Sequence, residues 1–264
     1  MPEKIVETPV QKELHVFFVL DTSASMLDQP ITALNDAMRS TVGELNKHDG
    51  TNADFFVGVL EFNDNARWIA NTRNGERKLT RLKDFTWTNL RAGGMTALGA
   101  ALKELNTALS RNDKMQSPTG NWAPVVIFMS DGGPTDDWRN GLTLISDNRW
   151  YQQAIKIAFA LGEHADKAVL EEVVNVGTNP GEVIKTNDLQ VFSDLIKLVA
   201  VTSSLASSRS KNVNDPVDTK AIVDEAKKAG GYEENDEGEV VQGKLAQIYD
   251  MNAPVDDDLF DDLG

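Results

Sequence analysis

Oxygen-bearing side chains follow directly on a largely apolar run near the start of the chain. Asp21, Ser23 and Ser25 come after residues 14–20, whose length and composition are typical of a buried strand. Carboxylate and hydroxyl oxygens are the ligands that hard divalent cations prefer, and Mg²⁺ takes about six of them at about 2.0–2.1 Å, with water completing the set. This segment therefore predicts half of a metal site.

Two later loops carry oxygen ligands in equivalent positions. Thr96 lies in the Gly-rich turn 93–96 that opens an apolar-periodic stretch, and Asp131 follows the apolar run 125–129. Ser and Asp also cap helices, so the first cluster alone is ambiguous. Ligands of open α/β sheets bind outside the carboxyl ends of the strands, where all three loops would meet. We therefore expect one divalent cation to be shared by these residues: Asp21, Ser23, Ser25, Thr96 and Asp131.

This pattern resembles the von Willebrand factor A (VWA) domains and their metal-ion-dependent adhesion site (MIDAS). The resemblance rests on Asp-x-Ser-x-Ser at residues 21–25, then Thr96, then Asp131, and it covers about residues 12–206. The family often has Gly in place of Ala24, which is not a ligand position. The resemblance implies that Ser23, Ser25 and Thr96 contact the metal, and that Asp21 and Asp131 act partly through water. It also implies Mg²⁺, with Mn²⁺ or Ca²⁺ able to substitute.

Within that family, the sequence is similar to small bacterial VWA proteins of tellurite-resistance and stress-response gene clusters. The similarity lies in residues 19–26, 29–31, 95–102 and 130–138. It implies a metal-dependent interaction module in a bacterial stress-response or signalling system. The expected partner is a protein that offers an Asp or Glu carboxylate to the cation. Trp138, just beyond the Asp131 loop, is expected to help anchor that partner.

Strand and helix patterns alternate along the chain, which predicts a doubly wound α/β fold with a mostly parallel sheet and helices on both faces. The expected strands are residues 14–20, 55–60, 125–129 and 154–161. Helical periodicity begins at Pro30, at Leu98 and at Leu189. Residues 61–72 are expected to add an antiparallel edge hairpin that turns at residues 63–65.

Charge is distributed unevenly. The formal net charge is −15, and residues 232–264, with eleven acidic residues and one lysine, contribute −10 of it, which leaves −5 for the rest. The polar composition beyond about residue 203 favours disorder, because little apolar surface can be buried there. We expect a VWA-like domain over residues 12–206 and a flexible acidic tail over residues 207–264, with short helices only at residues 218–229 and 240–249.

Composition also sets expectations for the environment of the protein. The chain has no cysteine, and its first residues lack a basic segment followed by an apolar one. No run approaches the roughly 20 apolar residues of a membrane span. A cytoplasmic protein is expected, with no membrane partner, and the acidic charge disfavours nucleic acid as a partner.

Three alternatives remain open at this stage. Asp21 is also placed like the nucleophile of a metal-dependent phosphohydrolase, although those enzymes of the haloacid dehalogenase type carry a second Asp where this chain has Ser23. The metal could instead be purely structural in a scaffold protein. Finally, the chain's own acidic tail could occupy the metal site or dock on the basic residues between positions 67 and 91.

Overall fold

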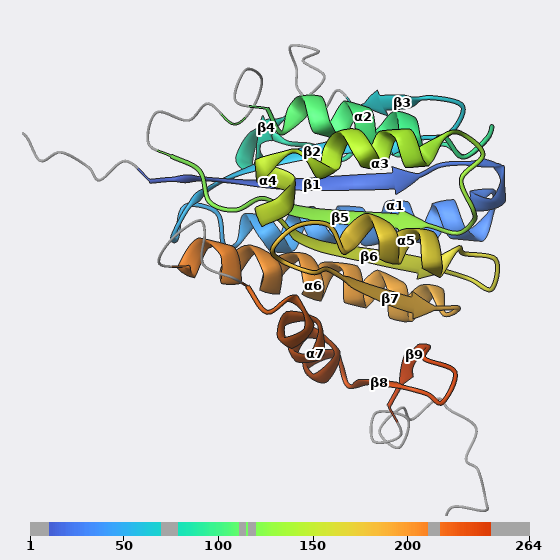
Figure 1. Ribbon diagram of the computed structural model, residues 1–264. Coiled ribbons are helices and arrows are strands. Elements are labelled where there is room, and N and C mark those ends of the chain that lie inside the picture. Colours follow the sequence, from blue (N-terminus) through green and yellow to red (C-terminus); the bar gives the residue numbers. More distant parts are fainter. Residues whose placement is uncertain (1–10, 70–78, 111–114, 116–119, 211–216, 244–264) are drawn as a thin grey trace, which may run out of the picture.

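The computed structural model describes residues 11–69, 79–110, 115, 120–210 and 217–243 (Figure 1). The strands are β1 (Glu13–Asp21), β2 (Asp54–Phe62), β3 (Ala66–Trp68), β4 (Thr80–Arg81), β5 (Val125–Ser130), β6 (Ile155–Leu161), β7 (Glu182–Thr186), β8 (Tyr232–Glu234) and β9 (Val240–Gln242). The helices are η1 (Ala24–Met26), α1 (Gln29–Asn46), η2 (Leu82–Asp84), α2 (Leu98–Ala108), α3 (Trp138–Ser146), α4 (Arg149–Gln153), α5 (Lys167–Val174), α6 (Leu189–Arg209) and α7 (Thr219–Gly230).

Seven strands form one mixed, mostly parallel sheet in the order β3-β2-β1-β5-β6-β7, with β4 also pairing with β2. The five long strands run parallel, whereas β3 and β4 are antiparallel to β2. The predicted doubly wound fold with an antiparallel edge is therefore confirmed. The predicted turn at residues 63–65 joins β2 to β3, and residues 70–72 of that hairpin lie outside the described part of the chain.

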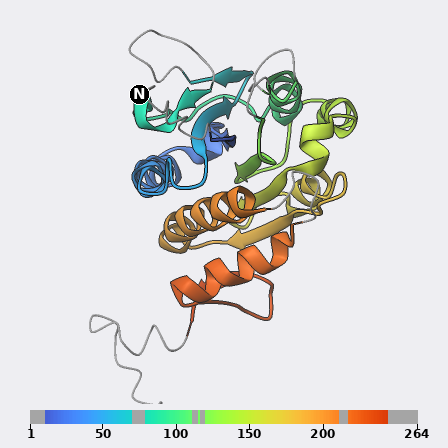
Figure 2. The ribbon, with the colours of Figure 1, turned by 90° about the vertical axis from the view of Figure 1, so that its left-hand side faces the viewer.

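Helices cover both faces of the sheet, which explains why β1 is apolar at nearly every position. Phe18 and Leu20 belong to the core on the face of α1 and α6, whereas Phe17 and Val19 belong to the core beneath α2, α3 and α5. Figure 2 shows α1 and α6 on one side of the sheet and α2, α3 and α5 on the other. A strand buried on both faces cannot alternate polar and apolar residues.

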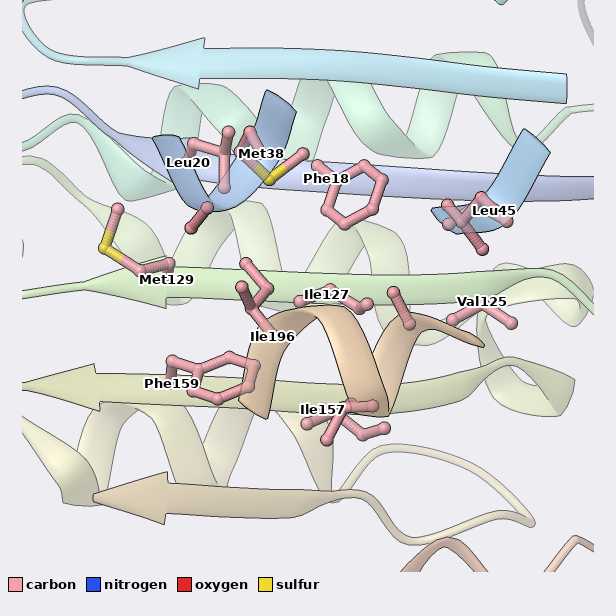
Figure 3. Packing of buried hydrophobic residues seen from close by; sticks show 14 of the residues in the cluster. Phe18, Leu20, Met38, Leu45, Val125, Ile127, Met129, Ile157, Phe159 and Ile196 are labelled. Carbon is pink, nitrogen blue, oxygen red and sulfur yellow. The ribbon is translucent and has the colours of Figure 1, made fainter. Parts of the chain in front are cut away.

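The helices on the first face are amphipathic in the predicted register. Helix α1 begins at Gln29 with Pro30 in its first turn, and buries Met38 and Leu45. Ile196 of α6 meets the sheet beside Ile127 and Ile157 (Figure 3). Within the described residues, α6 is the one helix long and apolar enough to cross a membrane. Here its buried side chains pack in the core that α6 and α1, side by side, form with one face of the sheet.

Residues 217–243 differ from the expected flexible tail. They form α7 and a β8–β9 hairpin that pack against the domain, with Ile222, Val223 and Ala226 buried against α6. The side chain of Thr186 on β7 donates a hydrogen bond to the Val240 carbonyl at 2.9 Å. Average composition is polar here, but α7 gathers its apolar residues on one face, and that face is buried in the shared core.

Of the two helices expected within the tail, the first is confirmed as α7. Residues 240–242 of the second are the strand β9, and residues 244–249 lie outside the described part of the chain. The ordered domain thus continues well past the expected boundary at residue 206.

We predict that Val223→Ala lowers the free energy of unfolding of the whole domain by about 2 kcal/mol, because it removes buried methyl groups from the shared core. Urea denaturation followed by circular dichroism measures this change. Glu225→Ala, an exposed change in the same helix, serves as the control and should have little effect. An unchanged main transition in Val223→Ala would show that residues 217–243 do not stabilise the domain.

Candidate metal centre

The carboxylate of Asp21 is buried and fixed at the end of β1. Its Oδ1 accepts a hydrogen bond from the Ser23 amide at 2.8 Å, and its Oδ2 accepts one from the Ser130 hydroxyl at 2.6 Å. Ser130 is the last residue of β5, the parallel neighbour of β1. The two strand ends therefore hold one carboxylate between them.

The side chains of Ser23, Ser25 and Asp131 come together across two loops. The Ser25 hydroxyl donates to Asp131 Oδ1 at 2.7 Å and lies 3.0 Å from the Ser23 hydroxyl, although Ser25 and Asp131 are 106 positions apart in sequence. Three hard oxygen donors thus share one small region at the carboxyl edge of the sheet.

The loop that carries Thr96 is tied by its backbone to both of the other loops. The Ala24 amide donates to the Gly94 carbonyl at 3.0 Å, and the Thr135 amide donates to the Thr96 carbonyl at 2.9 Å. Gly94 has a φ of +86°, and a Cβ there would lie 2.8 Å from the carboxylate of Asp64. The turn therefore requires glycine, both for its backbone conformation and for its close packing.

Burial sets the electrostatics of the two acidic residues. Desolvation raises the pKa of Asp21 above 3.8, against the lowering effect of hydrogen bonds from Ser130 and Ser23. Desolvation also raises the pKa of Asp131, against its hydrogen bond from Ser25 and the nearby charge of His164. Both carboxyl groups would be more fully ionised beside a bound cation, which favours the charged form.

The donor set fits a hard cation. It consists of two carboxylates and three neutral hydroxyl groups, without sulfur or imidazole. Among the described residues, no group of three or more His, Cys, Asp or Glu side chains is placed to hold a metal. Oxygen-only sites of this composition suit Mg²⁺, Mn²⁺ or Ca²⁺.

The structure brings all five predicted residues to one edge of the sheet. Side-chain contacts join Ser23, Ser25 and Asp131, Asp21 is linked through the Ser23 amide, and Thr96 is linked through its loop's backbone. Their role as metal ligands stays a prediction. Sequence reasoning missed Ser130, although its position directly before Asp131 at the end of an apolar run was a usable signal.

Asp136 was also missed. Its two carboxylate oxygens accept hydrogen bonds from the Gly99 and Ala100 amides at 2.9 Å each, in the first turn of α2. This long-range cap fixes the start of the helix that follows Thr96. No local pattern could reveal it, because the cap and the helix are about 37 residues apart in sequence.

Trp138 does not lie where the sequence analysis expected a partner anchor. Its side chain is only 7% exposed and packs in the core beneath α2 and α3, with the guanidinium of Arg139 4.4 Å from the ring centroid. Because the indole ring is packed in the core, little of its surface could contact a partner. In the described residues, the exposed large apolar side chains are those of Leu27, Met95 and Leu144.

The family model of the von Willebrand factor type A domain matches residues 15–198, which includes every predicted ligand. The chain belongs to this family. VWA domains are typically adhesion or protein-interaction modules, often with a MIDAS that binds a divalent cation, and they are usually not catalytic. Residues 217–243 lie beyond the matched region.

Solved structures with the same fold come from diverse organisms. The ArnB paralog VWA2 from Sulfolobus acidocaldarius is 16% identical, with a TM-score of 0.50 over 71% of this chain and 45% of its own. Proximal thread matrix protein 1 from the mussel byssus is 24% identical, with a TM-score of 0.50 over 72% and 47%. The PilB minor pilin from Streptococcus sanguinis is 13% identical, with a TM-score of 0.51 over 74% and 63%.

These likenesses establish the fold alone. This chain spans between about half and two thirds of the length of those proteins. A further structure of the mussel protein is described as having a zinc-occupied MIDAS motif.

We predict that Ser130→Ala makes Mg²⁺ binding more sensitive to acid. Loss of a hydrogen bond to the charged carboxylate removes a contact that favours the ionised form by about 1.5 kcal/mol or more, and so raises the pKa of Asp21 further. Protons would then compete with the metal at higher pH. Calorimetric Mg²⁺ titrations at a series of pH values below 7 should show affinity falling earlier than in the wild type.

The buried serine variant Ser203→Ala on α6 is the control for loss of a hydroxyl elsewhere. Identical pH profiles for Ser130→Ala and the wild type would show that Ser130 does not position Asp21 for metal binding.

Proposed function

We propose that this VWA domain is a metal-dependent protein-binding module that holds a divalent cation, Mg²⁺ in the first place, at Asp21, Ser23, Ser25, Thr96 and Asp131. The observation that carries the proposal is that the Ser25 hydroxyl lies 3.0 Å from the Ser23 hydroxyl and 2.7 Å from Asp131 Oδ1, which brings oxygens of two loops together. Thr96 would join them through its loop, which is bonded to both neighbouring loops.

The chemistry of the site favours an acidic ligand. A bound divalent cation would be the largest local charge and would attract an ionised Asp or Glu side chain of a partner protein. With one oxygen from each of the five residues, at least one of the about six coordination positions of Mg²⁺ would be left for water or an external ligand. Asp21 is directed away from solvent by Ser130 and Ser23, so the open side of the site lies toward Ser25 and Asp131, which are more exposed.

The biological setting is proposed from the sequence resemblance. The motifs around Asp21, Thr96 and Asp131 are similar to those of bacterial VWA proteins in stress-response and tellurite-resistance gene clusters. We propose a cytoplasmic stress-response or signalling role with a protein partner, and without nucleic acid or membrane as a ligand. The acidic charge of the chain supports the exclusion of nucleic acid.

The geometry disfavours the phosphohydrolase alternative. A nucleophilic carboxylate needs an oxygen directed at the substrate, but Asp21 is 0% exposed and both of its oxygens accept hydrogen bonds within the protein. We predict no turnover of a generic phosphomonoester with saturating Mg²⁺. Turnover that disappears in Asp21→Asn would contradict the binding function and favour the enzyme.

We predict that Asp131→Ala weakens Mg²⁺ binding at least about ten-fold, because even indirect partners of metal ligands contribute that much. The fold should persist, since Asp131 is partly exposed and follows the end of β5. Isothermal titration calorimetry measures the affinity, and circular dichroism checks the fold. Asp147→Ala, at the exposed carboxyl end of α3, removes a carboxylate of the same kind as a control.

Partner binding should follow metal binding. A partner captured with Mg²⁺ and lost both with a chelator and in Asp131→Ala would agree with the proposal. If the chelator lowers the melting temperature strongly while the partner stays bound, the metal is structural and the proposed function is wrong.

A further inference from the structure

Exposed apolar side chains lie beside the metal site. Leu27 is 52% exposed and Met95 is 56% exposed, and the third exposed large apolar residue in the described part of the chain, Leu144, lies on α3. Leu27 follows η1 by one residue and Met95 directly precedes Thr96. The hydrogen bond from the Ala24 amide to the Gly94 carbonyl holds their two loops side by side. We call Leu27 and Met95 the apolar rim.

The surroundings of the apolar rim are acidic. Asp28 is exposed next to Leu27, and the carboxylate of Asp64 accepts a hydrogen bond from the Met95 amide at 2.9 Å. An acidic ligand would be repelled by these groups unless a bound cation offset them. The ligand that fits this surface therefore joins a carboxylate to apolar side chains, and its binding depends on the metal.

One segment of this same chain has that chemistry. Residues 256–263, which lie outside the described residues, read Asp-Asp-Asp-Leu-Phe-Asp-Asp-Leu. Leu259 and Phe260 are flanked on both sides by carboxylates. The segment therefore carries both carboxylates and apolar side chains. A cation bordered by the apolar rim could bind both kinds of side chain, whereas a basic surface could bind only the carboxylates.

The segment can reach the site. Val240 of β9 is hydrogen-bonded to Thr186, the last residue of β7, so the hairpin lies at the same carboxyl edge as Asp21. Figure 1 shows the β8–β9 hairpin at the end of the sheet toward which β1 and β5 point. Three strand spacings of about 4.8 Å separate β7 from β1, or about 14 Å. From Gly243 to Asp256 there are 13 steps, which can span about 43 Å when extended.

We propose that residues 256–263 dock on the metal site of their own molecule, with an Asp carboxylate at the cation and Leu259 and Phe260 on the apolar rim. Docking would make the segment a built-in competitor of the partner protein. This inference rests on the proposed function, because it uses the same cation.

Two of the basic residues between positions 67 and 91 already have acidic partners within the domain. Arg67 forms an ion pair with Glu61, and Arg81 forms one with Asp54. Both guanidinium groups are already partly neutralised. Linkage within one chain, by contrast, provides an effective concentration of about 1 mM at the metal site, so even an affinity near 1 mM would half-occupy it.

Paramagnetic relaxation enhancement tests this docking on the full chain. Because the chain has no cysteine, Gly264→Cys accepts a single nitroxide label. With Mg²⁺, the amide signals of Leu27 and Met95 should lose intensity at least about two-fold, as half-occupancy implies, and the amide of Glu13, at the opposite end of β1, should not. The losses should disappear with a chelator and in the double variant Leu259→Ser with Phe260→Ser.

Variants of the apolar rim provide a second measurement. Leu27→Ser with Met95→Ser should abolish the signal losses, observed at the Ser25 and Gly94 amides, whereas the equally exposed change Leu144→Ser should preserve them. Losses that persist with a chelator would overturn the proposal. So would losses in a mixture of isotope-labelled chain and unlabelled, spin-labelled chain, which would show docking between molecules.

Calorimetry on the same full chain separates the two proposals. If Mg²⁺ binds with dependence on Asp131 but no relaxation enhancement appears, docking of residues 256–263 is wrong and the proposed metal function stands. If no Mg²⁺ binds, the proposed function itself is wrong.

Discussion

The parallel pairing of β1 with β5 is the constraint on which the rest of the site depends. Its register sets Leu20 opposite Met129, so that the next residues, Asp21 and Ser130, meet at the strand ends and share a hydrogen bond of 2.6 Å. That bond holds the carboxylate buried at the strand ends. The loops that follow the two strands therefore begin side by side at the same edge of the sheet. This allows Ser25 to contact Asp131, although the two residues are far apart in sequence.

The predicted metal site has two carboxylate residues and three hydroxyl residues. The hydroxyl residues supply ligand atoms without adding negative charge, so a cation held here would be less neutralised than in an all-carboxylate site. Burial of Asp21 and Asp131 raises their pKa values and thereby disfavours the charged forms when no cation is present. Such a balance suits reversible capture of an acidic ligand, in keeping with the interaction roles typical of VWA domains.

Much of the fold was predictable from sequence because the parallel strands are buried on both faces and therefore read as unbroken apolar runs. The positions of Asp21 and Asp131 followed from the rule that the ends of parallel strands meet at one edge of the sheet. Contacts that depend on how the chain packs in three dimensions were not predictable. Lys156 lies fully buried within β6, and its ammonium group donates to the carbonyls of Tyr151, Ala154 and Asn179 at 2.9–3.1 Å. The average composition of the tail likewise concealed the apolar face of α7. The burial of Trp138 depends on how α2 and α3 pack on the sheet, which the local sequence does not show.

The β8–β9 hairpin has a consequence for the outer border of the sheet. β7 is the last strand on its side, and Lys185 there meets Glu239 through both a backbone bridge and an ion pair of 2.7 Å. Unprotected border strands present open amide and carbonyl groups to other chains and promote aggregation. A version that ends at residue 210, just after α6, would uncover this border together with the apolar flank of α6, and would associate with itself.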